Sequence, residues 1–288
     1  MNHVQLDRRA MIKSSALLWA AATSGALFEP APQFQLGACD WSVGKSLNPE
    51  AFDRAKTIGL QGIQVSYNTG KDYIGLSNPA TLKSIQEASA RTGIKVSSLA
   101  IGELNRVPYK SKPETEAWVR NSVDAAKALG VKVILLAFFS DGDLRNDEAG
   151  KKAVIERLKK VAPHAEKQGI TLGIESYLTA QEHIDIIDAV GSKAVKVYYD
   201  FRNAADAGND VFKEIPMLGK DLICELHMKE NGQKLGQGTM DWPRIAKAVK
   251  DIGYQGWMQI EGATPPGAEL IECYQQNRKY LEGLFSFN

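Results

Sequence analysis

Apolar runs of two kinds alternate along this chain from Phe34 to the C-terminus. Eight short runs are rich in Val, Ile, Leu and aromatic residues, as buried strands usually are. The stretches that follow them carry apolar residues at helical spacing, and several begin with proline or end with glycine. The predicted strands are Phe34–Cys39, Gly62–Ser66, Lys95–Leu99, Lys132–Phe138, Thr171–Glu175, Val195–Asp200, Leu222–His227 and Trp257–Glu261.

Eight strands in alternation with eight helices favour a closed parallel barrel. The predicted helices are Pro49–Ile58, Pro79–Thr92, Pro113–Leu129, Asp147–Gln168, Ala180–Val190, Asp210–Leu218, Trp242–Ile252 and Ala268–Leu284. Residues 33–288 have the length of one (β/α)8 domain. An open doubly wound sheet is the alternative, but no Gly-rich dinucleotide motif follows the first strand. The pattern therefore predicts the α/β class and a single (β/α)8 TIM barrel.

Four residues that can bind a metal stand at the ends of the last four predicted strands. They are Glu175, Asp200, His227 and Glu261, separated by 25, 27 and 34 residues, about one β/α unit each. Parallel barrel strands all end on one face, so these side chains should converge there. Three carboxylates and one imidazole suit one divalent ion, Mn²⁺, Mg²⁺, Co²⁺ or Zn²⁺. The alternative is that they are ordinary polar residues at strand ends.

Side-chain alternation places further polar residues inside the barrel, one layer below these ligands. By this count Tyr198 lies below Asp200, Glu225 below His227 and Gln259 below Glu261. Such residues either orient the metal ligands or form a hydrogen-bonded polar pair within the barrel core. The sequence leaves both roles open.

The N-terminal residues predict export. A basic lead with Arg8 and Arg9 precedes a short Ala-rich apolar run, and small residues such as Ser24 and Ala26 fit a cleavage site. Residues 1–30 therefore resemble a twin-arginine signal peptide, although Asp7 replaces the usual serine or threonine. The alternatives are a Sec signal or a short uncleaved anchor. We expect a periplasmic protein, and no other segment of the sequence approaches a membrane span.

Charge and cysteine content limit the classes of binding partner and the disulfides that we expect. Without residues 1–30 the chain carries equal numbers of acidic and basic side chains. A neutral chain gives no electrostatic reason to bind nucleic acid or anionic lipid. The three cysteines, Cys39, Cys224 and Cys273, are too few for a disulfide framework. The oligomeric state stays open, and a homo-oligomer is one of the options.

Several short motifs resemble the xylose isomerase-like TIM barrel family. They are IES, YYD, LHMK, GQGTMDW and QIEG, and the resemblance covers the chain from about residue 33. The family includes sugar phosphate isomerases/epimerases, ketose 3-epimerases and inosose dehydratase. The resemblance implies that Glu175, Asp200, His227 and Glu261 bind the metal and that the two glutamates form the acid/base pair. This sequence departs from the ketose epimerase pattern at two places. It has Asn203 where those enzymes have a substrate-binding histidine, and SYLTAQE where they have a further glutamate.

This ligand set predicts removal of a proton α to a sugar carbonyl, through an enediolate that the metal stabilises. The leading expectation is an isomerase or epimerase for a small sugar. A lyase that eliminates the aglycone of a 3-keto-glycoside is the main alternative, and export favours an unphosphorylated substrate in either case. A non-catalytic sugar-binding barrel is a further alternative. Such a protein would be expected to lack some of the metal-binding residues, whereas all four are present in this sequence. Endonuclease IV-like barrels use more histidines and a basic face, which this chain lacks.

The residues that follow the strand ends are candidates for substrate contact. Lys229 shares the side of His227 and is a candidate proton donor or substrate ligand, or else a surface lysine. Arg202 and Asn203 follow Asp200 and are candidates for binding sugar hydroxyls. Trp41 and Tyr67 are candidate stacking surfaces for a sugar ring, or else loop anchors.

Overall fold

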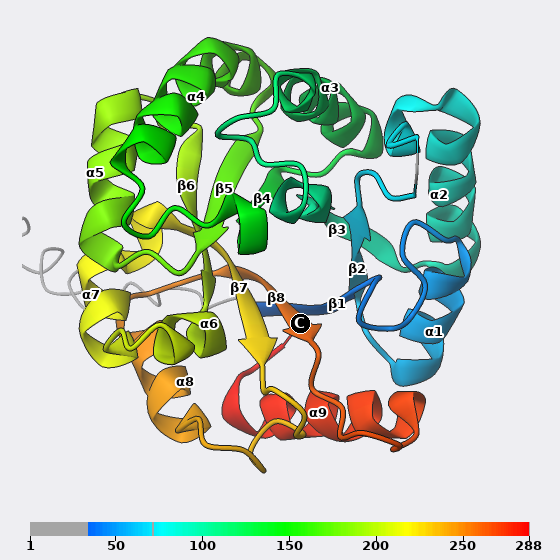
Figure 1. The fold of residues 1–288 in the computed structure, drawn as a ribbon. Helices are drawn as coiled ribbons and strands as arrows, with labels where there is room; N and C mark the ends of the chain where they lie inside the picture. The colour runs from blue at the N-terminus through cyan, green and yellow to red at the C-terminus, as the bar shows by residue number, and fades with distance from the viewer. Residues whose placement is uncertain (1–33, 71, 288) are drawn as a thin grey trace, which may run out of the picture. The chain divides into compact units, whose positions relative to one another are not determined.

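A ring of eight parallel strands forms the centre of the protein, as the sequence predicts. The computed structural model describes residues 34–70 and 72–287, so the predicted signal in residues 1–30 lies outside the described residues. The strands close in chain order, with β8 paired to β1, and the helices surround them (Figure 1). Their bounds are β1 Phe34–Cys39, β2 Gly62–Ser66, β3 Lys95–Ile101, β4 Val133–Phe138, β5 Thr171–Ser176, β6 Val195–Asp200, β7 Ile223–Lys229 and β8 Gly256–Glu261.

The helices follow the predicted order with one addition. They are α1 Glu50–Ile58, α2 Pro79–Thr92, α3 Glu114–Leu129, α4 Glu148–Gln168, α5 Ala180–Val190, α6 Phe201–Asp206, α7 Val211–Leu222, α8 Trp242–Asp251 and α9 Leu270–Leu284. Three 3-10 turns follow strands, namely η1 Gly75–Ser77, η2 Gly102–Asn105 and η3 Ser140–Gly142. In the described part of the chain no helix is both long and apolar enough to cross a membrane.

The added helix is α6, which the sequence prediction missed. It begins at the end of β6, where the Asp200 side chain accepts a hydrogen bond from the Asn203 backbone N–H at 2.8 Å. An aspartate at this position satisfies an otherwise unpaired amide of the first turn. The cap explains why a helix of six residues forms here despite its length. It also fixes Asp200 at the mouth of the barrel.

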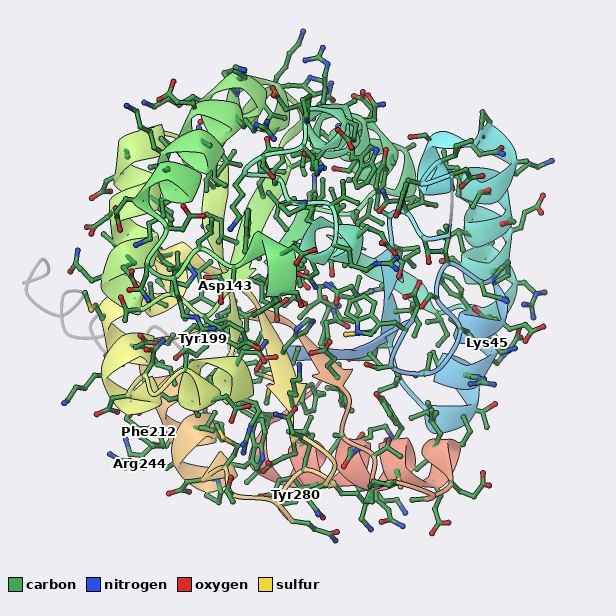
Figure 2. The ribbon with its side chains drawn as sticks, in the orientation of Figure 1. Lys45, Asp143, Tyr199, Phe212, Arg244 and Tyr280 are labelled. Carbon is green, nitrogen blue, oxygen red and sulfur yellow. The ribbon has the colours of Figure 1, made fainter. Side chains whose placement is uncertain are left out.

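Most of the apolar core lies between the strands and the helices, and the barrel interior is more polar. On β6, Tyr199 points outward and donates its hydroxyl to Glu214 of α7 at 2.8 Å, on the side of α6 and α7 in Figure 2. Tyr198 points inward and is completely buried. Gly37 of β1 leaves room inside, because a Cβ there would lie 2.2 Å from Gln259 Oε1. The predicted alternation therefore holds, with polar side chains filling the inside of the barrel below its mouth.

Candidate metal and sugar site

The four predicted ligands converge at the barrel mouth. One ligand atom from each of Glu175, Asp200, His227 and Glu261 lies within 4.8 Å of those from the other three. His227 Nδ1 is the nitrogen that faces the carboxylates, at 2.9 Å from Glu175 Oε1 and 3.5 Å from Glu261 Oε2. Because β5 to β8 are neighbours in the ring (Figure 1) and end on one face, the four residues at or near their ends converge.

The electrostatics of this cluster fit a divalent cation. Asp200 Oδ2 is buried and has no hydrogen-bond partner, which is costly for a carboxylate oxygen, and Glu261 Oε2 is buried beside the ammonium of Lys229. Burial, helped by the neighbouring carboxylates and opposed by Lys229, raises the pKa of Asp200 to about 7. An ion with two positive charges among these oxygens would relieve both penalties. Three carboxylates and one imidazole also match the donors that Mn²⁺, Mg²⁺, Co²⁺ and Zn²⁺ accept.

Trp41 and Lys229 hold Glu261 from two sides. The Trp41 indole N–H donates to Glu261 Oε1 at 2.8 Å, and Lys229 Nζ lies 3.0 Å from Glu261 Oε2. Burial alone would raise the pKa of Glu261, but His227, Lys229 and the Trp41 N–H bring it down to about 2. Glu261 is therefore a carboxylate at neutral pH. Trp41 thus contacts a candidate ligand directly, which the sequence did not predict.

Asn203 and Lys229 bring further polar groups to the same place. Asn203 is buried, and its Nδ2 donates to Glu175 Oε1 at 3.3 Å. Lys229 Nζ lies 3.8 Å from Asp200 Oδ2 as well as beside Glu261. Burial alone would lower the pKa of Lys229, but Glu261, Asp200 and Glu175 raise it overall, so the side chain is an ammonium.

A cavity of about 360 Å³ opens above this cluster. Glu175, Glu261, Lys229, Asn203 and Trp41 line one part of it. Most of the remaining wall comes from the ends of β2 to β5 and the residues that follow them, and includes Ser66, Asn68, Glu103, Asn105, Phe139 and Tyr177. The rings of Phe139 and Tyr177 pack edge to face with centroids 4.7 Å apart. The volume lies in the range of small-molecule sites.

The family assignment agrees with this architecture. The sequence profile described as "Xylose isomerase-like TIM barrel" matches residues 52–284. The chain belongs to the xylose isomerase-like TIM barrel family. The resemblance read from the sequence motifs is thereby confirmed.

Sugar epimerases are among the relatives of this xylose isomerase-like barrel. A protein of Escherichia coli (strain K12), provisionally named L-ribulose-5-phosphate 3-epimerase SgbU, is 25% identical over 273 residues, which are 86% of this chain and 95% of the relative. D-psicose 3-epimerase from Clostridium cellulolyticum H10, solved with D-tagatose, superposes with a TM-score of 0.74 at 18% identity, covering 87% of this chain and 99% of its own. The 3-keto-D-glucoside 4-epimerase YcjR from E. coli superposes with a TM-score of 0.72 at 16% identity, covering 87% and 100%.

Two predicted substrate contacts lie away from the cavity of this xylose isomerase-like barrel. Tyr67 is 1% exposed, packs in the core, and shares a 2.6 Å hydrogen bond between its hydroxyl and Ser77 Oγ. Arg202 forms an ion pair with Asp206 at 2.6 Å and donates to Thr239 Oγ1 at 2.8 Å, so it anchors the loop before α8. Both follow a strand end, but neither is among the residues that line the cavity. The structure therefore gives neither a contact with the cavity.

Several residues of the cavity wall were not predicted from the sequence. Asn68, Glu103 and Asn105 follow β2 and β3, whereas the predicted metal ligands all lie on the last four strands. Phe139 and Tyr177 follow β4 and β5. Applying the strand-end rule to all eight strands would have found Asn68 and Phe139, which stand one or two residues past their strands. Nothing in the local sequence distinguishes them from Tyr67.

Proposed function

We propose that this protein is a divalent-metal-dependent sugar isomerase or epimerase that removes a proton α to a sugar carbonyl. The observation that carries the proposal is the convergence of Glu175, Asp200, His227 and Glu261 beneath an open cavity. Relatives that bear epimerase names support the same reaction type. Two glutamates that line one cavity are the groups that proton removal and return require.

The four clustered side chains would hold the ion. When bound, such an ion polarises a substrate carbonyl and makes the neighbouring C–H more acidic. Glu261 is the stronger candidate for the group that transfers the proton. Trp41 and Lys229 restrain its two oxygens and so fix its position. Glu175 Oε1 lies 2.9 Å from His227 Nδ1 and is restrained by Asn203. Two carboxylates on different strands can act on the two faces of a sugar carbon.

Lys229 would hold or protonate a substrate oxygen. Its ammonium lines the cavity and is partly exposed, with 20% of the side-chain surface accessible. Because the nearby carboxylates keep it charged, it acts as a hydrogen-bond donor rather than as a base. An ammonium beside a developing oxyanion stabilises that charge.

The charge of the cavity favours an unphosphorylated sugar. Among the described wall residues Lys229 is the only cation, and Glu261 already neutralises it. The wall also contains Glu103, whose carboxylate forms a 2.5 Å ion pair with Arg106. Arg106 itself does not line the cavity, and 67% of its side-chain surface is exposed to solvent. A phosphate dianion would meet acidic groups here instead of the cations it requires. Export from the cytoplasm, which we propose from residues 1–30, also agrees with a neutral sugar.

A second candidate is elimination from a 3-keto-glycoside. The observation in its favour is the aromatic wall of Phe139 and Tyr177, which would accept an apolar or ring-shaped aglycone beyond the metal-proximal groups. In this reaction a carboxylate takes the C2 proton and the C1–O bond breaks. The aglycone then leaves as an alcohol, and an unsaturated keto-sugar remains.

One experiment separates these reactions. The metal-loaded protein is incubated in D₂O with free ketoses, with their phosphates and with 3-keto-glycosides. Deuterium at an α-carbon with the aglycone intact supports the isomerase or epimerase, whereas release of the aglycone supports the lyase. Turnover without solvent exchange or elimination would refute proton abstraction, and sugar binding without any reaction would indicate a non-catalytic barrel.

A further inference from the structure

We propose that Gln64, held in one orientation by the buried Glu225, fixes which nitrogen of His227 carries the proton and so leaves Nδ1 free to bind the metal. Gln64 is thus a positioning residue at the floor of the site, on β2, across the barrel from its target on β7. The inference rests on the proposed metal site and goes beyond the ligands themselves.

Glu225 is 1% exposed and lies inside the barrel. Its Oε2 lies 2.8 Å from Ser98 Oγ, 3.0 Å from Tyr198 OH and 3.4 Å from Gln259 Nε2. An amide NH₂ can only donate, so Oε2 is an acceptor. In the structure both hydroxyls donate to this oxygen, so neither directs its hydrogen at Gln64.

This arrangement determines the orientation of the Gln64 amide. Gln64 Nε2 lies 3.1 Å from Ser98 Oγ and 3.0 Å from Tyr198 OH. Since the hydrogens of both hydroxyls are used on Glu225, the group that faces their oxygens has to be the NH₂ of Gln64. The flipped amide would place its carbonyl oxygen against two oxygens that have no hydrogen to offer. The Gln64 carbonyl therefore points the other way.

The Gln64 carbonyl in turn determines the state of His227. Gln64 Oε1 lies 2.9 Å from His227 Nε2 and also accepts the Cys39 thiol hydrogen at 3.2 Å. A carbonyl oxygen only accepts, so Nε2 has to carry a hydrogen. In the neutral imidazole this leaves the lone pair on Nδ1, which is the nitrogen that faces Glu175 and Glu261.

Burial makes the relay necessary. Gln64, Ser98 and His227 have no exposed surface, so water does not replace a lost partner at Nε2. Without the Gln64 carbonyl the Nε2 hydrogen would keep only a weak acceptor, Cys39 Sγ at 3.4 Å, and the competing tautomer with a hydrogen on Nδ1 would be favoured. That tautomer has no lone pair on the side of the carboxylates.

The first test measures metal affinity by calorimetry with Mn²⁺ and Zn²⁺. Gln64→Leu keeps the size of the side chain and removes the acceptor, and should weaken binding about 10- to 100-fold. Asn277→Leu is the control, because Asn277 is an equally buried amide that bonds the backbone of Leu235 and Ala263 and has no hydrogen bond to His227 or Glu225. It should change the affinity less than about threefold.

The second test observes the proton directly, which a role in folding alone would not affect. Nitrogen-15 spectra of the Zn²⁺-loaded protein, assigned with a His227→Gln variant, should show the ring hydrogen of His227 on Nε2. A hydrogen on Nδ1, or a folded Gln64→Leu that binds metal as tightly as wild type, would overturn the inference. Wild type that binds no divalent ion would instead refute the proposed function, so the two failures are distinguishable.

Discussion

Replacing Trp41 by phenylalanine tests the restraint on Glu261 most directly. The change removes the indole N–H that lies 2.8 Å from Glu261 Oε1 but keeps an aromatic ring in the cavity wall. A hydrogen bond to a charged acceptor contributes about 1.5–3 kcal/mol. The Glu261 side chain is 16% exposed, so water replaces part of that contact and the lower end of the range applies. About 1.4 kcal/mol corresponds to a tenfold change in rate.

We therefore expect kcat/KM of Trp41→Phe to fall about tenfold, mainly through kcat, because a mobile Glu261 transfers a proton less efficiently. The assay is the rate of solvent deuterium exchange into the best substrate, with metal content measured in the same samples. A sugar-stacking role predicts the opposite ranking, in which Trp41→Phe is nearly normal and Trp41→Leu raises KM. An unchanged kcat in metal-replete Trp41→Phe would refute the restraint on Glu261.

Three further predictions concern the ligands, stability and export. Purified wild type should hold about one divalent ion per chain and His227→Ala much less, since a four-residue site loses a ligand. Equal metal content in the two proteins, measured by metal analysis, would contradict the site. Burial lowers the pKa of His183 to about 4, and its Nε2 accepts from Ser176 Oγ at 2.9 Å. A folded-state pKa below the unfolded value means that the stabilisation is present above pH 6.5 and is lost as the pH falls towards 4. Between pH 7 and 4, wild type should thus lose about 3 kcal/mol more unfolding free energy than His183→Gln, as measured by urea denaturation; parallel curves would contradict this. Residues 1–30 fused to a reporter that fluoresces only after folded export should give a periplasmic signal that Arg8→Lys with Arg9→Lys abolishes; an unchanged signal would indicate the Sec route.

The hydrophobic pattern alone determines the barrel and its candidate ligands. Strand and helix periods differ, so the chain reveals each strand, and parallel strands in a closed ring must end on one face. Glu175, Asp200, His227 and Glu261 follow from that rule without any knowledge of distances. Alternation along β6 also predicts correctly that Tyr198 points inward.

Only the tertiary structure decides what the residues beyond the strand ends contact. Tyr67 and Asn68 are adjacent in sequence, yet the turn after β2 buries Tyr67 in the core and places Asn68 at the cavity. Arg202 is drawn away by Asp206 because α6 brings them one helical turn apart, and α6 itself depends on the Asp200 cap.

The contact between Gln64 and His227 lies furthest from what a sequence can predict. It joins β2 to β7 across the interior of the barrel, between residues 163 positions apart in the chain. Periodicity indicates that both side chains face inward, but the layer in which they meet depends on the stagger of the strands around the closed ring. The direction of each hydrogen bond depends in turn on the donors and acceptors that the other strands bring to that layer. The identity of the candidate ligands is therefore a property of the sequence, and their orientation is a property of the closed barrel.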